Sequence, residues 1–165
     1  MEYLMNINVL SQKNKAFFFI SLLVSAPLQA AQSQTLEMNL WLKARFGAQH
    51  QALIPIVAVA DMLYSCQQQK RKADSLTIKV LITQLDKNTL AEQLITCLAG
   101  ESPKSDTALN YGLKACFYEQ FSHLSLAEKQ QKMAVVTQTI ATLSRSERQK
   151  SFTQCVTDQA IHYLH

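Results

Sequence analysis

Four cysteines are the residues whose type and spacing most clearly imply chemistry in this 165-residue chain: Cys66, Cys97, Cys116 and Cys155. No two of them form the CxxC motif that thiol redox sites and structural zinc sites use. Each follows an apolar residue by three positions, which places it on the apolar stripe of a predicted helix. We therefore expect two structural disulfides and no reactive thiol; four cysteines allow three connectivities.

A second group of candidate residues lies at the C-terminus, where Asp158, His162 and His165 are spaced i, i+4 and i+7. This spacing puts a carboxylate and two imidazoles on one flank of a helix, and both are ligands that suit zinc or copper. The alternative is a solvated last turn, in which histidine complements the helix dipole. A metal site at these three residues is therefore one of two hypotheses for this segment.

Asp61 is the only charged residue between Ala52 and Tyr64. A buried carboxyl group with a raised pKa can serve as a general acid. We expect instead that Asp61 lies at the edge of its apolar stripe and meets a lysine. No HExxH or GxSxG motif is present, and three glycines leave no room for a phosphate loop or a dinucleotide fingerprint, so no cofactor is expected.

Two segments are candidates for contact with a partner. The first, at 36–46, carries six large apolar residues, among them Trp41 and Phe46, which is more than one apolar stripe needs. We expect this excess to pack in the core, with contact to a partner as the alternative. The second is the basic cluster Lys70, Arg71 and Lys72, which is typical of a solvated helix end and alternatively suits an acidic partner or lipid headgroups.

The N-terminus determines the expected compartment. Lys13 and Lys15 precede the apolar run Ala16 to Ala26, which is followed by Pro27-Leu28-Gln29-Ala30, with the small residue Ala30 at the expected cleavage point. This pattern is typical of a secretory signal peptide, here residues 1–30, with Met1 or Met5 as the start. We expect export to the periplasm and one helical domain at 31–165, without stable membrane insertion, because no later stretch is long and apolar enough. The alternative is an uncleaved N-terminal anchor.

Composition and capping signals favour an all-α fold. The chain is 48% hydrophobic and 17% charged, as in globular proteins, and glycine is too scarce for a β-rich fold. The motifs Thr89-x-x-Glu92, Ser125-x-x-Glu128 and Ser144-x-x-Glu147 resemble capping boxes at breaks between apolar stripes. We predict a compact bundle of about six to seven short helices, the first of them at 36–46 with Gly47 as its C-cap and the second at 53–69.

Residues 53–98 and 107–157 form a candidate internal repeat. Laid over each other without gaps, 82–98 and 140–156 match Ile82 with Ile140 and Cys97 with Cys155. Such a repeat predicts two three-helix units, each with one cysteine on its first helix and one on its last. It favours the pairing Cys66–Cys97 and Cys116–Cys155; coincident helical patterning is the alternative explanation.

The sequence therefore predicts an exported, non-enzymatic protein–protein interaction module of the cell envelope, such as an inhibitor, an immunity protein or an accessory subunit. The net charge of +4 is too small and too scattered to indicate a nucleic-acid partner. Two alternatives remain at this stage: a metal-binding protein that uses the C-terminal face, and an enzyme that acts through Asp61 or a histidine. The partner and the oligomeric state do not follow from the sequence.

Overall fold

The computed structural model describes the backbone of residues 28–70 and 76–164, and the side chains of 37–70 and 76–164. Within these residues the chain is all helical, as predicted, with six helices and no strand. The helices are α1 (Leu28–Gln69), α2 (Ile78–Gln84), α3 (Lys87–Leu98), α4 (Asp106–Gln120), α5 (Leu126–Thr142) and α6 (Arg145–Ile161).

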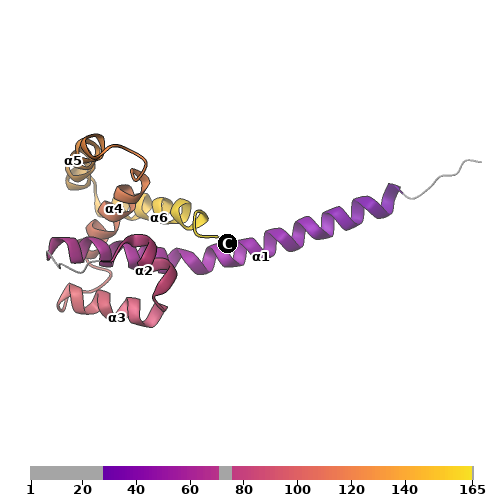
Figure 1. The fold of residues 1–165 in the computed structure, drawn as a ribbon, viewed down its shortest axis with the longest axis horizontal. Coiled ribbons are helices and arrows are strands. Elements are labelled where there is room, and N and C mark those ends of the chain that lie inside the picture. Colours follow the sequence, from indigo (N-terminus) through magenta and orange to yellow (C-terminus); the bar gives the residue numbers. More distant parts are fainter. Residues whose placement is uncertain (1–27, 71–75, 165) are drawn as a thin grey trace, which may run out of the picture.

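Helix α1 is continuous over 42 residues, and its N-terminal part projects from the rest of the molecule (Figure 1). The prediction of two helices separated at Gly47 is therefore wrong, because both Gly47 and Pro55 lie inside α1. An interior glycine costs only about 1 kcal/mol relative to alanine, so a helix need not end there. Pro55 costs more, about 3 kcal/mol, and α1 is held on both sides of it. On the N-terminal side, His50 Nε2 donates to the Thr157 carbonyl of α6 at 2.7 Å; on the C-terminal side, core residues such as Leu63 are fully buried.

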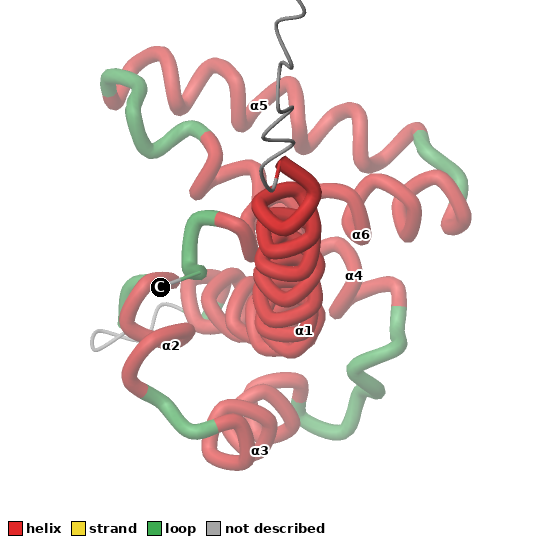
Figure 2. The backbone as a smooth tube through the Cα atoms, turned by 90° about the vertical axis from the view of Figure 1, so that its right-hand side faces the viewer, coloured by secondary structure: helices red, strands yellow, loops and turns green. Residues whose placement is uncertain are grey.

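The C-terminal half of α1 is the central element of the fold, as its apolar composition predicts. Seen nearly end-on in Figure 2, α1 has α2 and α3 on one side and α4, α5 and α6 on the other, and Figure 1 shows the same division. The core is built from α1, α2, α3, α4 and α6, whereas α5 contributes only Ile140 to the fully buried set and packs mainly on α4.

The two disulfides have the predicted pairing. Cys66 of α1 is bonded to Cys97 of α3, and Cys116 of α4 is bonded to Cys155 of α6. All four sulfurs are buried in the core, so the cysteines are structural here. Each disulfide joins the first and third helix of a consecutive triplet, which is the arrangement that two three-helix units require. Duplication itself stays a prediction.

Two of the three predicted capping boxes are confirmed. Ser125 begins α5 and Ser144 begins α6, each with the reciprocal hydrogen bonds to a glutamate three residues on. The box predicted at Thr89 is wrong, because α3 begins earlier. Its N-cap is Asp86, whose carboxylate accepts from the backbone N–H groups of Asn88 and Thr89 at 3.0 and 3.1 Å. Because the Asp86 carboxylate accepts hydrogen bonds from two N–H groups that lack a partner in the helix, it caps α3 fully, and Thr89 is not needed as the N-cap.

No helix in the described part of the chain is long and apolar enough to cross a membrane. The apolar run of the predicted signal peptide lies outside the described residues. The bond predicted to be cleaved, after Ala30, lies in the first turn of α1.

Candidate functional site

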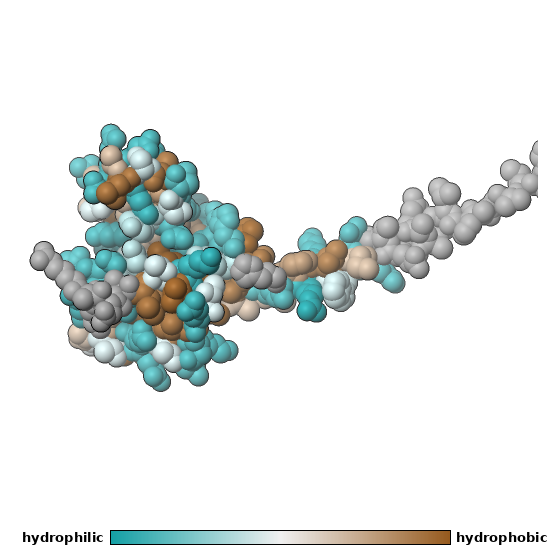
Figure 3. All heavy atoms as spheres, in the orientation of Figure 1, coloured by the Kyte–Doolittle hydropathy of each residue, from teal (hydrophilic) through white to brown (hydrophobic). Residues whose placement is uncertain are grey.

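The projecting part of α1 exposes large apolar side chains. Met38, Leu40 and Trp41 are 57%, 58% and 55% exposed, and Phe46 is 46% exposed. Figure 3 shows hydrophobic residues among hydrophilic ones on the projection. The expectation that this segment packs in the core is therefore wrong. A helix that projects has no neighbouring helix to cover it. An excess of apolar residues in the sequence does not show whether those residues are buried in the core or exposed on a projecting helix.

A basic side chain of the projection contacts its tryptophan. The guanidinium of Arg45 lies over the ring of Trp41, 5.5 Å from the ring centroid, in cation–π contact. Such a stacked arginine and tryptophan are the residue types most enriched at the energetic centres of protein interfaces. We name Met38, Leu40, Trp41 and Phe46 the α1 patch.

The basic cluster at the other end of α1 is only partly described. The ammonium of Lys70 donates to the carbonyl oxygen of Cys97 near the C-terminus of α3. It thereby satisfies a carbonyl of the last helical turn and complements the helix dipole. Lys70 is thus held by the fold, while Arg71 and Lys72 lie outside the described residues.

The C-terminal face forms part of a polar pocket of about 330 Å³. Asp158 and His162 both line it, as do Glu119, His123 and Tyr163, whereas His165 lies outside the described residues. The carboxylate of Asp158 accepts hydrogen bonds from Gln154 Nε2 at 2.9 and 3.0 Å. Although these side chains line one pocket, no three histidine, cysteine, aspartate or glutamate side chains within the described ranges are arranged so that they could hold a metal ion. The site with His165 stays an untested prediction.

Asp61 is fully buried between α1 and α6. The expectation that it lies at an edge beside a lysine is wrong: its partner is Gln159, whose Nε2 donates to Asp61 Oδ1 at 3.2 Å. Burial holds the pKa of Asp61 well above its ordinary value, the Gln159 hydrogen bond opposes this, and the charge of Glu119 adds to it. Neither Asp61 Oδ2 nor Gln159 Oε1 has a hydrogen-bond partner among the described residues. If Asp61 is protonated, its hydroxyl can donate to Gln159 Oε1.

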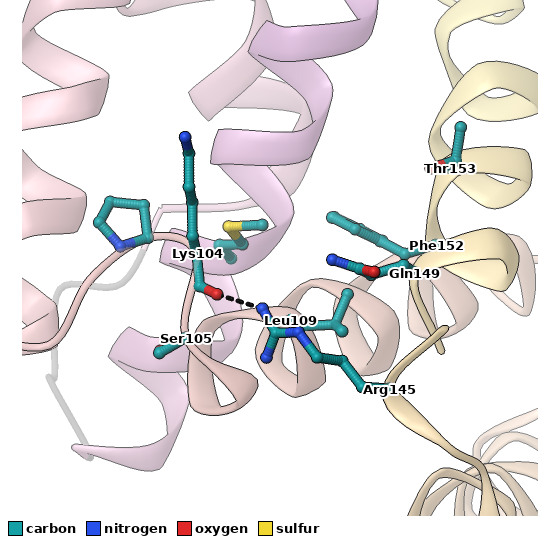
Figure 4. A pocket seen from close by; sticks show the side chains of 9 residues that line it. Lys104, Ser105, Leu109, Arg145, Gln149, Phe152 and Thr153 are labelled. Atoms are coloured by element: carbon teal, nitrogen blue, oxygen red, sulfur yellow. Dashed lines mark hydrogen bonds between the residues drawn. The ribbon is translucent and has the colours of Figure 1, made fainter. Parts of the chain in front are cut away.

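A pocket of about 450 Å³ lies between α6 and the segment that joins α3 to α4 (Figure 4). Apolar side chains from three helices line it: Met62 of α1, Leu109 of α4 and Phe152 of α6. Figure 4 shows Phe152 and Gln149 extending from α6 toward the opposite wall. The ring of Phe152 rests on Gly112, where an added Cβ would lie 2.4 Å from Phe152 Cζ, so this glycine sets the position of the pocket wall.

The rim of the same pocket is basic. Lys104 and Arg145 line it, and the Arg145 guanidinium donates to the Lys104 carbonyl and to the Asp106 carboxylate. Arg148 Nη2 lies 3.2 Å from the same Asp106 oxygen. Two guanidinium groups therefore bind one carboxylate, with the Lys104 side chain as a further cation on the same rim. Sequence reasoning missed this pocket because it identified the starts of α4 and α6 separately, and their proximity is a tertiary property.

Comparisons with protein-family models, curated proteins and solved structures gave no match to this chain. The fold and the residues described above are therefore the basis for assigning a function.

Proposed function

We propose that this protein is an exported, non-enzymatic protein–protein interaction module of the cell envelope, acting as an inhibitor, an immunity protein or an accessory subunit. The observation that carries the proposal is the α1 patch, four large apolar side chains that are each about half exposed on a projecting helix. Exposed apolar clusters on folded proteins mark binding surfaces, and burying them on a partner is favourable by about 25 cal/mol per Å².

The form of the patch suits a protein partner. A projecting helix presents side chains around its circumference, which a groove or a helical bundle in another protein can enclose. Trp41 supplies the largest contact area at small cost in side-chain entropy, and Arg45 is already positioned over its ring. The body of the protein, crosslinked by two disulfides, holds the base of this helix rigid and lowers the entropy lost on binding.

Export is supported by two independent features. The basic and apolar pattern around Lys13, Lys15 and 16–26 is that of a signal peptide. The two disulfides suit an oxidising compartment such as the periplasm, where disulfides persist. Cell fractionation and N-terminal sequencing of the purified protein test this part, with Ala31 expected as the first residue.

The interaction is tested by capture from the envelope fraction of the producing organism. The wild-type chain is compared with Trp41→Ser/Phe46→Ser and with Ile95→Ser/Val135→Ser, which removes two exposed apolar side chains from α3 and α5. We expect one stoichiometric partner with the wild type and the control, and its loss with the α1 variant. Equal capture by all three proteins, or none from an extract that contains the protein at natural levels, would contradict the proposal.

A further inference from the structure

The pocket between α6 and the α3–α4 segment carries an inference that is independent of the α1 patch. We propose that it binds a small amphipathic anion, an alkyl carboxylate whose chain lies on the apolar floor and whose carboxylate meets the basic rim. The juxtaposition of Met62, Leu109 and Phe152 with Lys104 and Arg145 defines this ligand class.

The size and lining of the pocket suit such a ligand. Its volume of about 450 Å³ falls in the range of small-molecule sites, roughly 300–1,000 Å³. Leu109 and Phe152 are each 6% exposed, and they are fixed by the core beneath them, so the floor is preformed. Polar side chains line the rest of the pocket, among them Gln149 and Thr153 of α6. An apolar floor beside polar and charged groups suits a ligand that has an apolar chain and one charged end.

The charge of the rim determines the sign of the ligand. Lys104 and Arg145 line the pocket and provide two cations. Asp106 forms ion pairs with Arg145 and with the neighbouring Arg148, which does not itself line the pocket. Both arginines already bind Asp106, whereas the ammonium of Lys104 forms no ion pair among the described residues. Lys104 is therefore the cation free to meet a ligand carboxylate.

The backbone adds to the same preference. Helix α4 begins directly after Lys104, with Ser105 as its N-cap, and α6 begins at Arg145. The N-terminal ends of two helices therefore lie at the pocket, and each carries partial positive charge, which Asp106 of α4 and Glu147 of α6 offset in part. A cationic or neutral headgroup would gain nothing from these dipoles, whereas a carboxylate gains from both.

The test uses the oxidised full chain and decanoate below its micelle concentration, followed by ¹H–¹⁵N NMR. We expect saturable shifts of the amides of Leu109, Phe152 and Thr153, which line the pocket. The neutral analogue decanol has the same chain and is expected to bind about fivefold more weakly, which corresponds to the loss of one exposed charge pair.

The site is assigned by a pair of matched variants. Lys104→Glu is expected to weaken decanoate binding by about fivefold or more. Lys87→Glu, which makes the same charge change at an exposed position at the start of α3, is expected to leave it unchanged. Preservation of the amide spectrum outside the pocket shows that each variant is folded.

Four results would overturn the proposal. These are an absence of shifts at millimolar decanoate, equal binding of decanoate and decanol, equal weakening by the two variants, and shifts confined to the α1 patch. Equal weakening by the two variants would mean that only the net charge of the protein attracts the anion. Shifts confined to the α1 patch would mean that the alkyl chain adsorbs to the exposed apolar helix.

Discussion

Replacing Asp61 by asparagine is expected to stabilise this protein at neutral pH and to change how its stability depends on pH. Asp61 is fully buried, and its single hydrogen bond comes from Gln159. Asparagine has the same shape and no charge. Its Oδ1 can accept from Gln159 Nε2, while its Nδ2 can donate to Gln159 Oε1, an atom that otherwise lacks a partner. A buried polar atom without a partner costs about 1–3 kcal/mol.

The sign of the pH effect follows from the raised pKa of Asp61. Between the pKa of the unfolded chain, about 4, and that of the folded protein, the folded state holds one proton more than the unfolded state. Stability is therefore fully present below about pH 4 and falls as the pH rises toward the folded pKa, by about 1.4 kcal/mol per pH unit. The asparagine variant lacks this proton and this slope.

Urea unfolding between pH 4 and pH 8 measures the effect. Wild type and Asp61→Asn are expected to be similarly stable near pH 4, with the variant gaining about 1.4 kcal/mol per unit above it until the folded carboxyl ionises. Asp158→Asn removes the same charge from an exposed position of α6 and serves as the control. Parallel profiles for wild type and Asp61→Asn would refute the reasoning, because they would mean that Asp61 titrates alike in both states.

The remaining predictions concern the disulfides and the two helical glycines. Replacing Cys116 and Cys155 together by serine is expected to cost about 4 kcal/mol, because the bond closes a loop of sequence separation 39; a loss below about 1 kcal/mol in urea unfolding would contradict the chain-entropy account. Gly112→Ala is expected to destabilise the fold by about 1–3 kcal/mol, because its Cβ would collide with the ring of Phe152. Gly47→Ala is expected to stabilise the fold by up to about 1 kcal/mol, since its Cβ would meet nothing within 4 Å. A shift of the Tm in the same direction for Gly112→Ala and Gly47→Ala would contradict the different surroundings of the two glycines.

The C-terminal end of α3 and the helices after it could be predicted because local signals mark these positions. Ser105, Ser125 and Ser144 each cap the helix that follows, and the break after α3 has Ala99 and Gly100 in the left-handed region at φ 52° and 98°. These signals act over three or four residues, so they can be read without knowledge of the tertiary structure. The predicted disulfide pairing, which was inferred from the candidate repeat, was correct.

The course of α1 could not be predicted in this way. Gly47 and Pro55 are the ordinary signals for a C-cap and for a first helical turn, and each is compatible with both a break and a continuous helix. The outcome depends on contacts distant in sequence, such as the His50 hydrogen bond to Thr157, 107 residues away. The burial of Asp61 is of the same kind, because its partner Gln159 is 98 residues away.

The sequence identified residues of the candidate site, but it did not predict their exposure or their arrangement in space. The excess of apolar residues around Trp41 was evident from the sequence, but their exposure follows from the projection of α1 beyond the other helices. The basic rim at Lys104 and Arg145 depends on two helix starts that lie about forty residues apart in the sequence and come together only in the fold.

Site-specific photocrosslinking from the α1 patch in living cells of the producing organism tests the central claim most directly. A photoreactive residue in place of Trp41 is compared with one in place of Ile95, an exposed apolar position on α3. We predict one discrete crosslinked protein from position 41 and none from position 95. The same products from both positions, or crosslinks from position 41 only to lipid, would contradict an interaction module that acts through α1.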